Sequence, residues 1–121
     1  MQTAHFSEVS VDRDSLKCLA ADVIATWFGD LASLEHAVDR GRRSQRAFRV
    51  TLPDHSDIAS TSAALAHVGK GRDWFGHGGQ FWMWSAVLDY DDGMCAAIVA
   101  QYDRRAGELE QRLRALQEGG R

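Results

Sequence analysis

Residues 16–38 read LKCLAADVIATWFGDLASLEHAV, and the spacing of their apolar side chains predicts a long helix. These side chains recur every three or four residues, which places them on one stripe of an α-helix. Asp12 precedes the stretch as a suitable N-cap, Gly41 follows it as a suitable end, and Gly29 within it indicates close packing. The predicted stripe comprises Leu16, Ala20, Val23, Trp27, Leu31, Leu34 and Val38.

A second helix is predicted to begin near Asp54 or Ser56 and to end at Gly69 or Gly71. Its apolar stripe is thin. Five of the eleven residues from 69 to 79 are glycine, which is typical of a turn-rich connection.

The last predicted helix runs from about Gln80 toward Glu118. Residues 91–93, Asp-Asp-Gly, mark a place where this helix is expected to kink or break. The fold class that follows is mainly α: a small helical bundle of three to four helices in a single domain over residues 1–121.

A minor two-stranded ribbon is compatible with this bundle. Residues 48–52 alternate between apolar and polar side chains until Pro53. Val9 and Val11 alternate in the same way, so the two pieces can pair, and each is equally compatible with an extended loop.

Composition excludes several classes of protein. Hydrophobic residues make up 45% of the chain and charged residues 26%, as in an ordinary globular domain. The net charge of −3 disfavours nucleic acid as a partner. The chain contains neither a signal-peptide pattern nor an apolar run long enough to span a membrane, which favours the cytoplasm and leaves signal-independent secretion open. Cys18 and Cys95 are expected to be buried thiols.

Candidates for catalysis or metal binding are sparse. The cluster of Asp89, Asp91 and Asp92 lacks the ligand order of a calcium loop and is better explained by a solvated polar face or a kink. Gly69-Lys70-Gly71 does not fit a phosphate-binding loop. None of the histidines belongs to a zinc-binding pattern, so no catalytic residue, metal or cofactor is expected. The histidines are His5, His36, His55, His67 and His77.

An all-round apolar turn, Phe81-Trp82-Met83-Trp84, is the most distinctive feature of the chain. One helix cannot bury every side of such a turn, so another element or a partner must cover the far side. A basic segment precedes the second helix and can bind acidic groups through its guanidinium groups. The partner-binding residues predicted from these two features are Trp74, Phe81, Trp82, Trp84, Arg42, Arg43, Arg46 and Arg49.

Three short motifs carry a resemblance to a known family. They are residues 11–16 (VDRDSL) followed by residues 19–21 (LAA), residues 74–76 (WFG) before the last helix, and a tyrosine-bearing C-terminal helix. Together they resemble the small helical proteins of type VII (ESX) secretion, the WXG100 and EspC-like proteins.

The resemblance implies an antiparallel helical hairpin that pairs with itself or with a sister protein and acts as a substrate or carrier. Trp74 and Gly76 would then match the turn motif of the family. The family's export signal, a tyrosine followed four residues later by an acid, is not met at Tyr90 or Tyr102.

The function expected from the sequence is a non-enzymatic protein–protein interaction module that binds another protein or itself, as a homodimer or heterodimer. One alternative is an inhibitor, encoded by a phage or mobile element, that binds a host defence or nucleic-acid enzyme. Another is a small ligand- or metal-binding enzyme domain built around His67, His77 and the Asp89 cluster.

Overall fold

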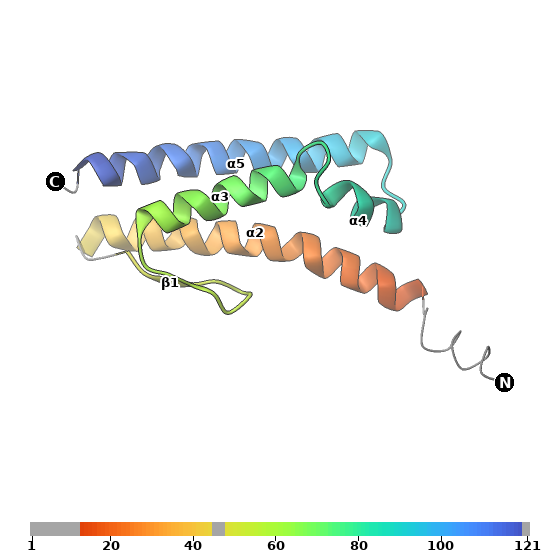
Figure 1. Cartoon of the computed structure of the whole chain (residues 1–121), viewed down its shortest axis with the longest axis horizontal. Coiled ribbons are helices and arrows are strands. Elements are labelled where there is room, and N and C mark those ends of the chain that lie inside the picture. Colours follow the sequence, from red (N-terminus) through yellow and green to blue (C-terminus); the bar gives the residue numbers. More distant parts are fainter. Residues whose placement is uncertain (1–12, 45–47, 120–121) are drawn as a thin grey trace.

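The computed structural model describes residues 13–44 and 48–119. This part of the chain forms four α-helices and one two-stranded antiparallel sheet (Figure 1). It confirms the predicted mainly α bundle with a minor ribbon. The elements in chain order are α2 (Arg13–Ser44), β1 (Val50–Thr51), β2 (Asp57–Ile58), α3 (Thr61–Phe75), α4 (Phe81–Val87) and α5 (Asp92–Gly119).

The two long helices, α2 and α5, run in the same direction, and α3 returns in the opposite direction beside them (Figure 1). Two ion pairs fix this parallel register: Arg105 bonds Glu35 at 2.6 Å, and Arg112 bonds Asp39 one turn further along α2. α4 lies against α2 near the start of α5. The two long helices therefore do not form the antiparallel hairpin that the resemblance to type VII proteins implies.

Aromatic side chains fill the centre of the core. Phe75 of α3 stacks on Tyr102 of α5 at a centroid distance of 4.3 Å and lies 5.1 Å from Phe81 of α4. All three side chains are fully buried. A Cβ atom at Gly71 would lie 1.9 Å from the Tyr102 hydroxyl oxygen, so the missing side chain lets α3 approach α5.

The first predicted helix is longer than its apolar stripe. α2 continues past Gly41 to Ser44, so the predicted end is wrong. Leu16, expected in the core, is 39% exposed because it lies in the first turn of α2, at the edge of the bundle. Gly29 does mark close packing, since its Cβ would lie 3.3 Å from Cγ of Pro53. Asp12 lies outside the described residues.

The second predicted helix begins later than expected. Its N-cap is Ser60, whose hydroxyl accepts a hydrogen bond from the Ala63 N–H at 3.1 Å. The residues before it form the ribbon instead: Ile58 pairs with Val50, and Asp57 with Thr51. Asp57 and Ile58 were not predicted as a strand. The pairing suggested for Val9 and Val11 falls on residues outside the described part of the chain.

Two predicted stops in α3 are also wrong. The helix runs through Gly69 and Gly71 to Phe75, and the connection to α4 contains only residues 76–80. Gly79 is needed in this turn, because a Cβ there would lie 2.3 Å from the Trp74 carbonyl oxygen.

The predicted break in the last helix is confirmed, and it separates α4 from α5. Asp89 adopts a left-handed conformation, with φ of 58°. The N–H of Asp89 donates to the Ala86 carbonyl and that of Tyr90 to the Ser85 carbonyl, the pair of bonds that ends a helix in a Schellman motif. Asp91 then caps α5 by accepting the Met94 N–H at 2.7 Å.

None of the helices in the described ranges is long and apolar enough to cross a lipid bilayer.

Candidate functional site

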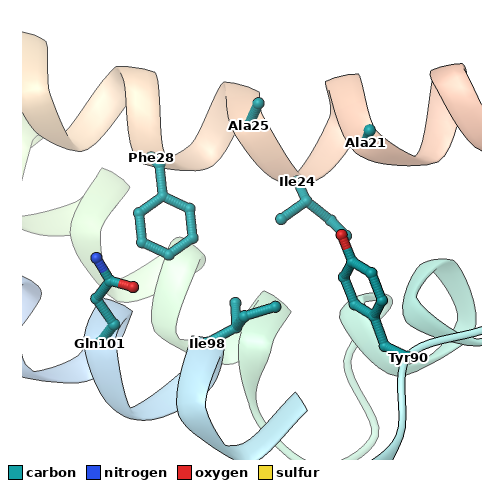
Figure 2. A pocket seen from close by; sticks show the side chains of 7 residues that line it. All are labelled: Ala21, Ile24, Ala25, Phe28, Tyr90, Ile98 and Gln101. Carbon is teal, nitrogen blue, oxygen red and sulfur yellow. The ribbon is translucent and has the colours of Figure 1, made fainter. Parts of the chain in front are cut away.

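An open, largely apolar groove of about 270 Å³ lies between α2 and α5 (Figure 2). We call it the α2–α5 groove. One wall comes from α2, the other from α5, and Tyr90 closes one end from the turn before α5. The lining residues are Ala21, Ile24, Ala25, Phe28, Tyr90, Ile98 and Gln101.

The groove follows from local structure in three elements. Ala21, Ala25 and Phe28 share a face of α2 because they are three or four residues apart. Ile98 and Gln101 share a face of α5 for the same reason. The left-handed turn at Asp89 redirects the chain, so that the Tyr90 ring reaches toward α2 (Figure 2).

The groove contains no charged side chain. Ala21 and Ala25 are exposed, so they leave the α2 wall low and accessible. The polar groups of the lining are the Tyr90 hydroxyl and the Gln101 amide. Such a surface can bind an apolar partner with a few hydrogen bonds, and it supplies neither a nucleophile nor an acid–base pair.

Charged side chains stand beyond both ends of the groove. Past Phe28, the Arg105 guanidinium bonds Glu35 and lies 5.9 Å from the Phe28 ring centroid. At the other end, Lys17 of α2 pairs with Asp89 at 3.4 Å. The groove thus has one ion pair beyond each of its two ends.

The predicted aromatic contact residues are mostly built into the bundle. Phe81 is completely buried and presents no surface to a partner, which corrects the expectation that it contacts one. Trp82 and Trp84 are half-buried and pack against the core. Their indole nitrogens are buried without an acceptor among the described residues. Trp74 is also half-buried and donates to the Gln80 side chain at 3.4 Å.

The predicted arginine surface is only partly described. Arg49 is exposed, just before β1. Arg46 and the side chains of Arg42 and Arg43 lie outside the described residues.

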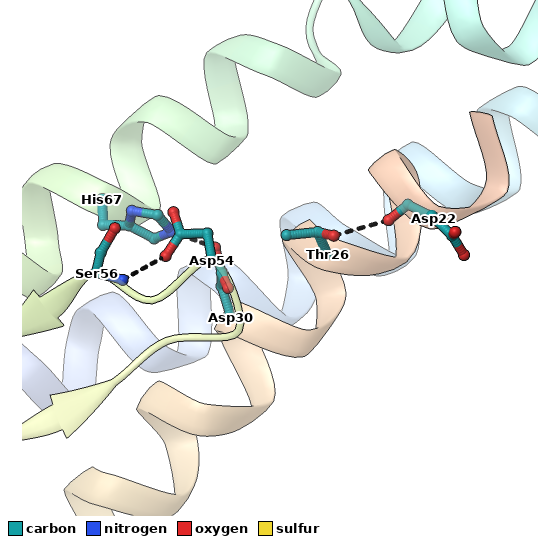
Figure 3. A network of polar contacts seen from close by, with 6 residues as sticks. All are labelled: Asp22, Thr26, Asp30, Asp54, Ser56 and His67. Carbon is teal, nitrogen blue, oxygen red and sulfur yellow. Dashed lines mark hydrogen bonds and ion pairs between the residues drawn. The ribbon is translucent and has the colours of Figure 1, made fainter. Parts of the chain in front are cut away.

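A second polar feature joins α2 to α3. Asp30 Oδ2 and His67 Nε2 are 2.9 Å apart, and the Asp30 residue is only 2% exposed (Figure 3). The His67 ring stacks on Trp27 at a centroid distance of 5.4 Å. Asp30 Oδ1 has no hydrogen-bond partner among the described residues. Enclosure of His67 between Asp30 and Trp27 favours a role in packing the two helices.

Burial and hydrogen bonding act oppositely on the pKa of Asp30. Burial penalises the carboxylate and raises the pKa, whereas His67 lowers it by a smaller amount. Asp54, in the loop between β1 and β2, contributes a small further increase. The pKa of Asp54 itself is lowered, chiefly because Ser56 donates hydrogen bonds to its carboxylate (Figure 3).

The residues of the alternative enzyme or metal site do not converge. His67 bonds Asp30, whereas His77 stacks on Trp82 at 5.8 Å. Asp89 belongs to the turn that ends α4. In the described residues no group of three or more histidine, cysteine, aspartate or glutamate side chains is placed to hold a metal ion.

The two cysteines differ in environment. Cys95 is a buried thiol, as predicted, whereas Cys18 is exposed on α2. Both are free.

Comparison with known proteins identifies no relative. No family model, no curated protein and no solved structure matches this chain.

Neither the groove nor the Asp30–His67 pair was predicted from the sequence. A signal for the pair existed, because Asp30 lies on the apolar face of α2 and His67 is flanked by the buried Ala64 and Val68 in α3. The sequence carried no signal for the groove, because its two walls belong to helices that are brought together only by tertiary packing.

Proposed function

We propose that this chain is a non-enzymatic protein–protein interaction module whose partner docks in the α2–α5 groove. The observation that carries the proposal is the groove itself: an open apolar channel lined by seven uncharged side chains. Contiguous exposed apolar surface commonly marks an interaction site.

An exposed apolar side chain next to the groove extends this surface. Met94 is 47% exposed at the start of α5. Met94 is four residues before Ile98, so it continues the α5 wall of the groove. A partner that covers the groove gains additional apolar area from Met94.

The arrangement of titratable groups supports a role in binding more than one in catalysis. The closest acid–base pair, Asp30 and His67, packs α3 on α2 and is covered by Trp27. The groove, by contrast, lacks ionisable groups other than the Tyr90 phenol.

Site-specific photo-cross-linking in extracts of the source cells tests the proposal. A photoreactive side chain replaces Ala25 in the groove or, as the control, Ala100, which is exposed on another face of α5. We expect a discrete adduct from position 25 and none from position 100. The adduct is then identified, and the purified protein must bind the chain directly.

The proposal is contradicted if position 25 gives no adduct, or gives only the adducts that position 100 also gives. It is also contradicted if the purified partner binds the wild-type chain and the Ala25→Arg variant with equal affinity.

A further inference from the structure

We propose that the Asp30–His67 pair is a pH-sensitive link that holds residues 52–68 against α2. These residues comprise the β1–β2 loop, β2 and the first half of α3, and we call them the linked segment. The link is closed while the two side chains carry at least one proton, and it loosens when the last proton leaves. Neither side chain lines the α2–α5 groove, so the link is separate from the proposed docking site.

The charge of the pair depends on how many protons it holds. With one proton, the pair is either an ion pair or two neutral groups, so no net charge is buried. Without a proton, Asp30 is an almost fully buried carboxylate beside a neutral imidazole. Its Oδ1 is buried and has no hydrogen-bond partner among the described residues. This state is costly, because neither water nor a cation compensates the buried charge.

Two titratable groups of other elements face the pair. Asp54 of the β1–β2 loop lies beside His67 (Figure 3). The pKa of Asp30 is raised chiefly by burial, and the negative charge of Asp54 raises it further. The pKa of Tyr102 in α5 is also raised chiefly by burial, and the charge of Asp30 adds to this increase. Since a phenol is neutral at ordinary pH, Asp54 supplies the charge that repels an unprotonated pair.

The linked segment depends on packing for its structure. The ribbon has two residues in each strand, and its loop lies against α2 next to Asp30, where a Cβ on Gly29 would be 3.3 Å from Cγ of Pro53. A short hairpin is only marginally stable in water, and so is a short isolated helix. Loosening from α2 therefore makes the backbone hydrogen bonds of the linked segment open more often.

The rest of the bundle is held by other contacts. At the C-terminal end of α3, Phe75 stacks on Tyr102 of α5 and packs edge-on against Phe28 of α2. Further along α2, Glu35 pairs with Arg105 of α5. None of these contacts involves Asp30 or His67. Loss of the last proton should therefore open the linked segment locally and leave the bundle folded.

Hydrogen–deuterium exchange of the full chain tests the proposal, with rates corrected for intrinsic exchange at each pH. Histidine side chains ordinarily titrate between about pH 5 and about pH 8. From about pH 5 to about pH 9, we expect the protection of the linked segment to fall at least about fivefold. The protection of residues 95–113 in α5 should change less than about twofold.

Two variants fix the pair in opposite states. In Asp30→Asn the amide carries no charge at any pH, so the linked segment should stay protected and the pH dependence should disappear. In His67→Gln the neighbour of Asp30 is always neutral, so the linked segment should exchange faster than in wild type at neutral pH. The control is His36→Gln, which removes an exposed histidine from α2 and should behave like wild type.

A linked segment whose protection does not change with pH would overturn the proposal. A fall in protection that persists in Asp30→Asn would also overturn it, and so would an equal loss in α5, because the whole chain would then open as one unit. If His67→Gln does not fold, the comparison of wild type with Asp30→Asn decides.

Discussion

The side chains of Asp30 and His67 face each other across α2 and α3, with Oδ2 and Nε2 2.9 Å apart and the carboxylate almost wholly enclosed. These two residues are 37 positions apart in the chain. Their contact ties the long first helix to the returning helix, close to the loop of the ribbon (Figure 3).

Burial of Asp30 gives stability a definite pH dependence. Since its pKa is raised in the folded state, the folded protein holds this proton at pH values where the unfolded chain has lost it. The contribution of Asp30 to the free energy of unfolding therefore falls as pH rises from its ordinary pKa through its folded pKa. In Asp30→Asn this contribution is absent.

Urea denaturation of wild type and Asp30→Asn across the acid range measures this effect. The difference in unfolding free energy, wild type minus variant, should decrease as pH rises. Asp22→Asn, which removes an exposed carboxylate from the same helix, controls for the loss of one charge. A difference that increases with pH would contradict the assigned direction.

Gly71 and Gly69 should respond oppositely to alanine. At Gly71 the new methyl group would collide with Tyr102, so Gly71→Ala should lower the free energy of unfolding by about 1–3 kcal/mol. At Gly69 no atom lies within 4 Å of the new Cβ, so Gly69→Ala should raise it by up to about 1 kcal/mol through helix propensity. Chemical denaturation of both variants checks the prediction. Stabilisation by Gly71→Ala would show that α3 and α5 are less closely packed than described.

The Glu35–Arg105 pair should contribute more than the Lys17–Asp89 pair. Side chains of the first pair are 27% and 28% exposed, whereas those of the second are 74% exposed at Asp89 and 40% at Lys17. A double-mutant cycle with Glu35→Gln and Arg105→Gln should give a coupling of about 1 kcal/mol. A cycle with Lys17→Gln and Asp89→Asn should give about zero. Equal coupling energies in the two cycles would mean that the Glu35–Arg105 pair does not stabilise the parallel register of α2 and α5.

Much of the fold could be predicted because helix periodicity is local. The spacing in residues 16–38 indicated α2, and Asp-Asp-Gly at residues 91–93 indicated the break before α5. Glycine caused the errors at the helix ends. Gly69 and Gly71 were interpreted as helix ends, but a glycine that ends a helix and one that admits a neighbouring side chain look the same in a single sequence. At Gly71, the position of Tyr102 distinguishes the two cases.

The groove could not be predicted because it needs two helices far apart in the sequence to lie parallel. In the sequence, Ala21 and Ala25 look like ordinary exposed alanines. They line a groove only because the fold places Ile98 and Tyr90 opposite them. For the all-round apolar turn, the sequence left two alternatives open, another element of the chain or a partner. Phe81 is buried by Phe75 and Trp74, so a neighbouring element, and no external partner, covers that side of α4.

The affinity of the Ala25→Arg variant for the partner identified by cross-linking tests the central claim most directly. Calorimetry should show a loss of at least about thirtyfold relative to wild type, because a bulky cation at a central position blocks the channel. Ala100→Arg should bind as wild type does, and all three proteins should melt at the same temperature. Undiminished affinity in a folded Ala25→Arg variant would contradict docking in the α2–α5 groove.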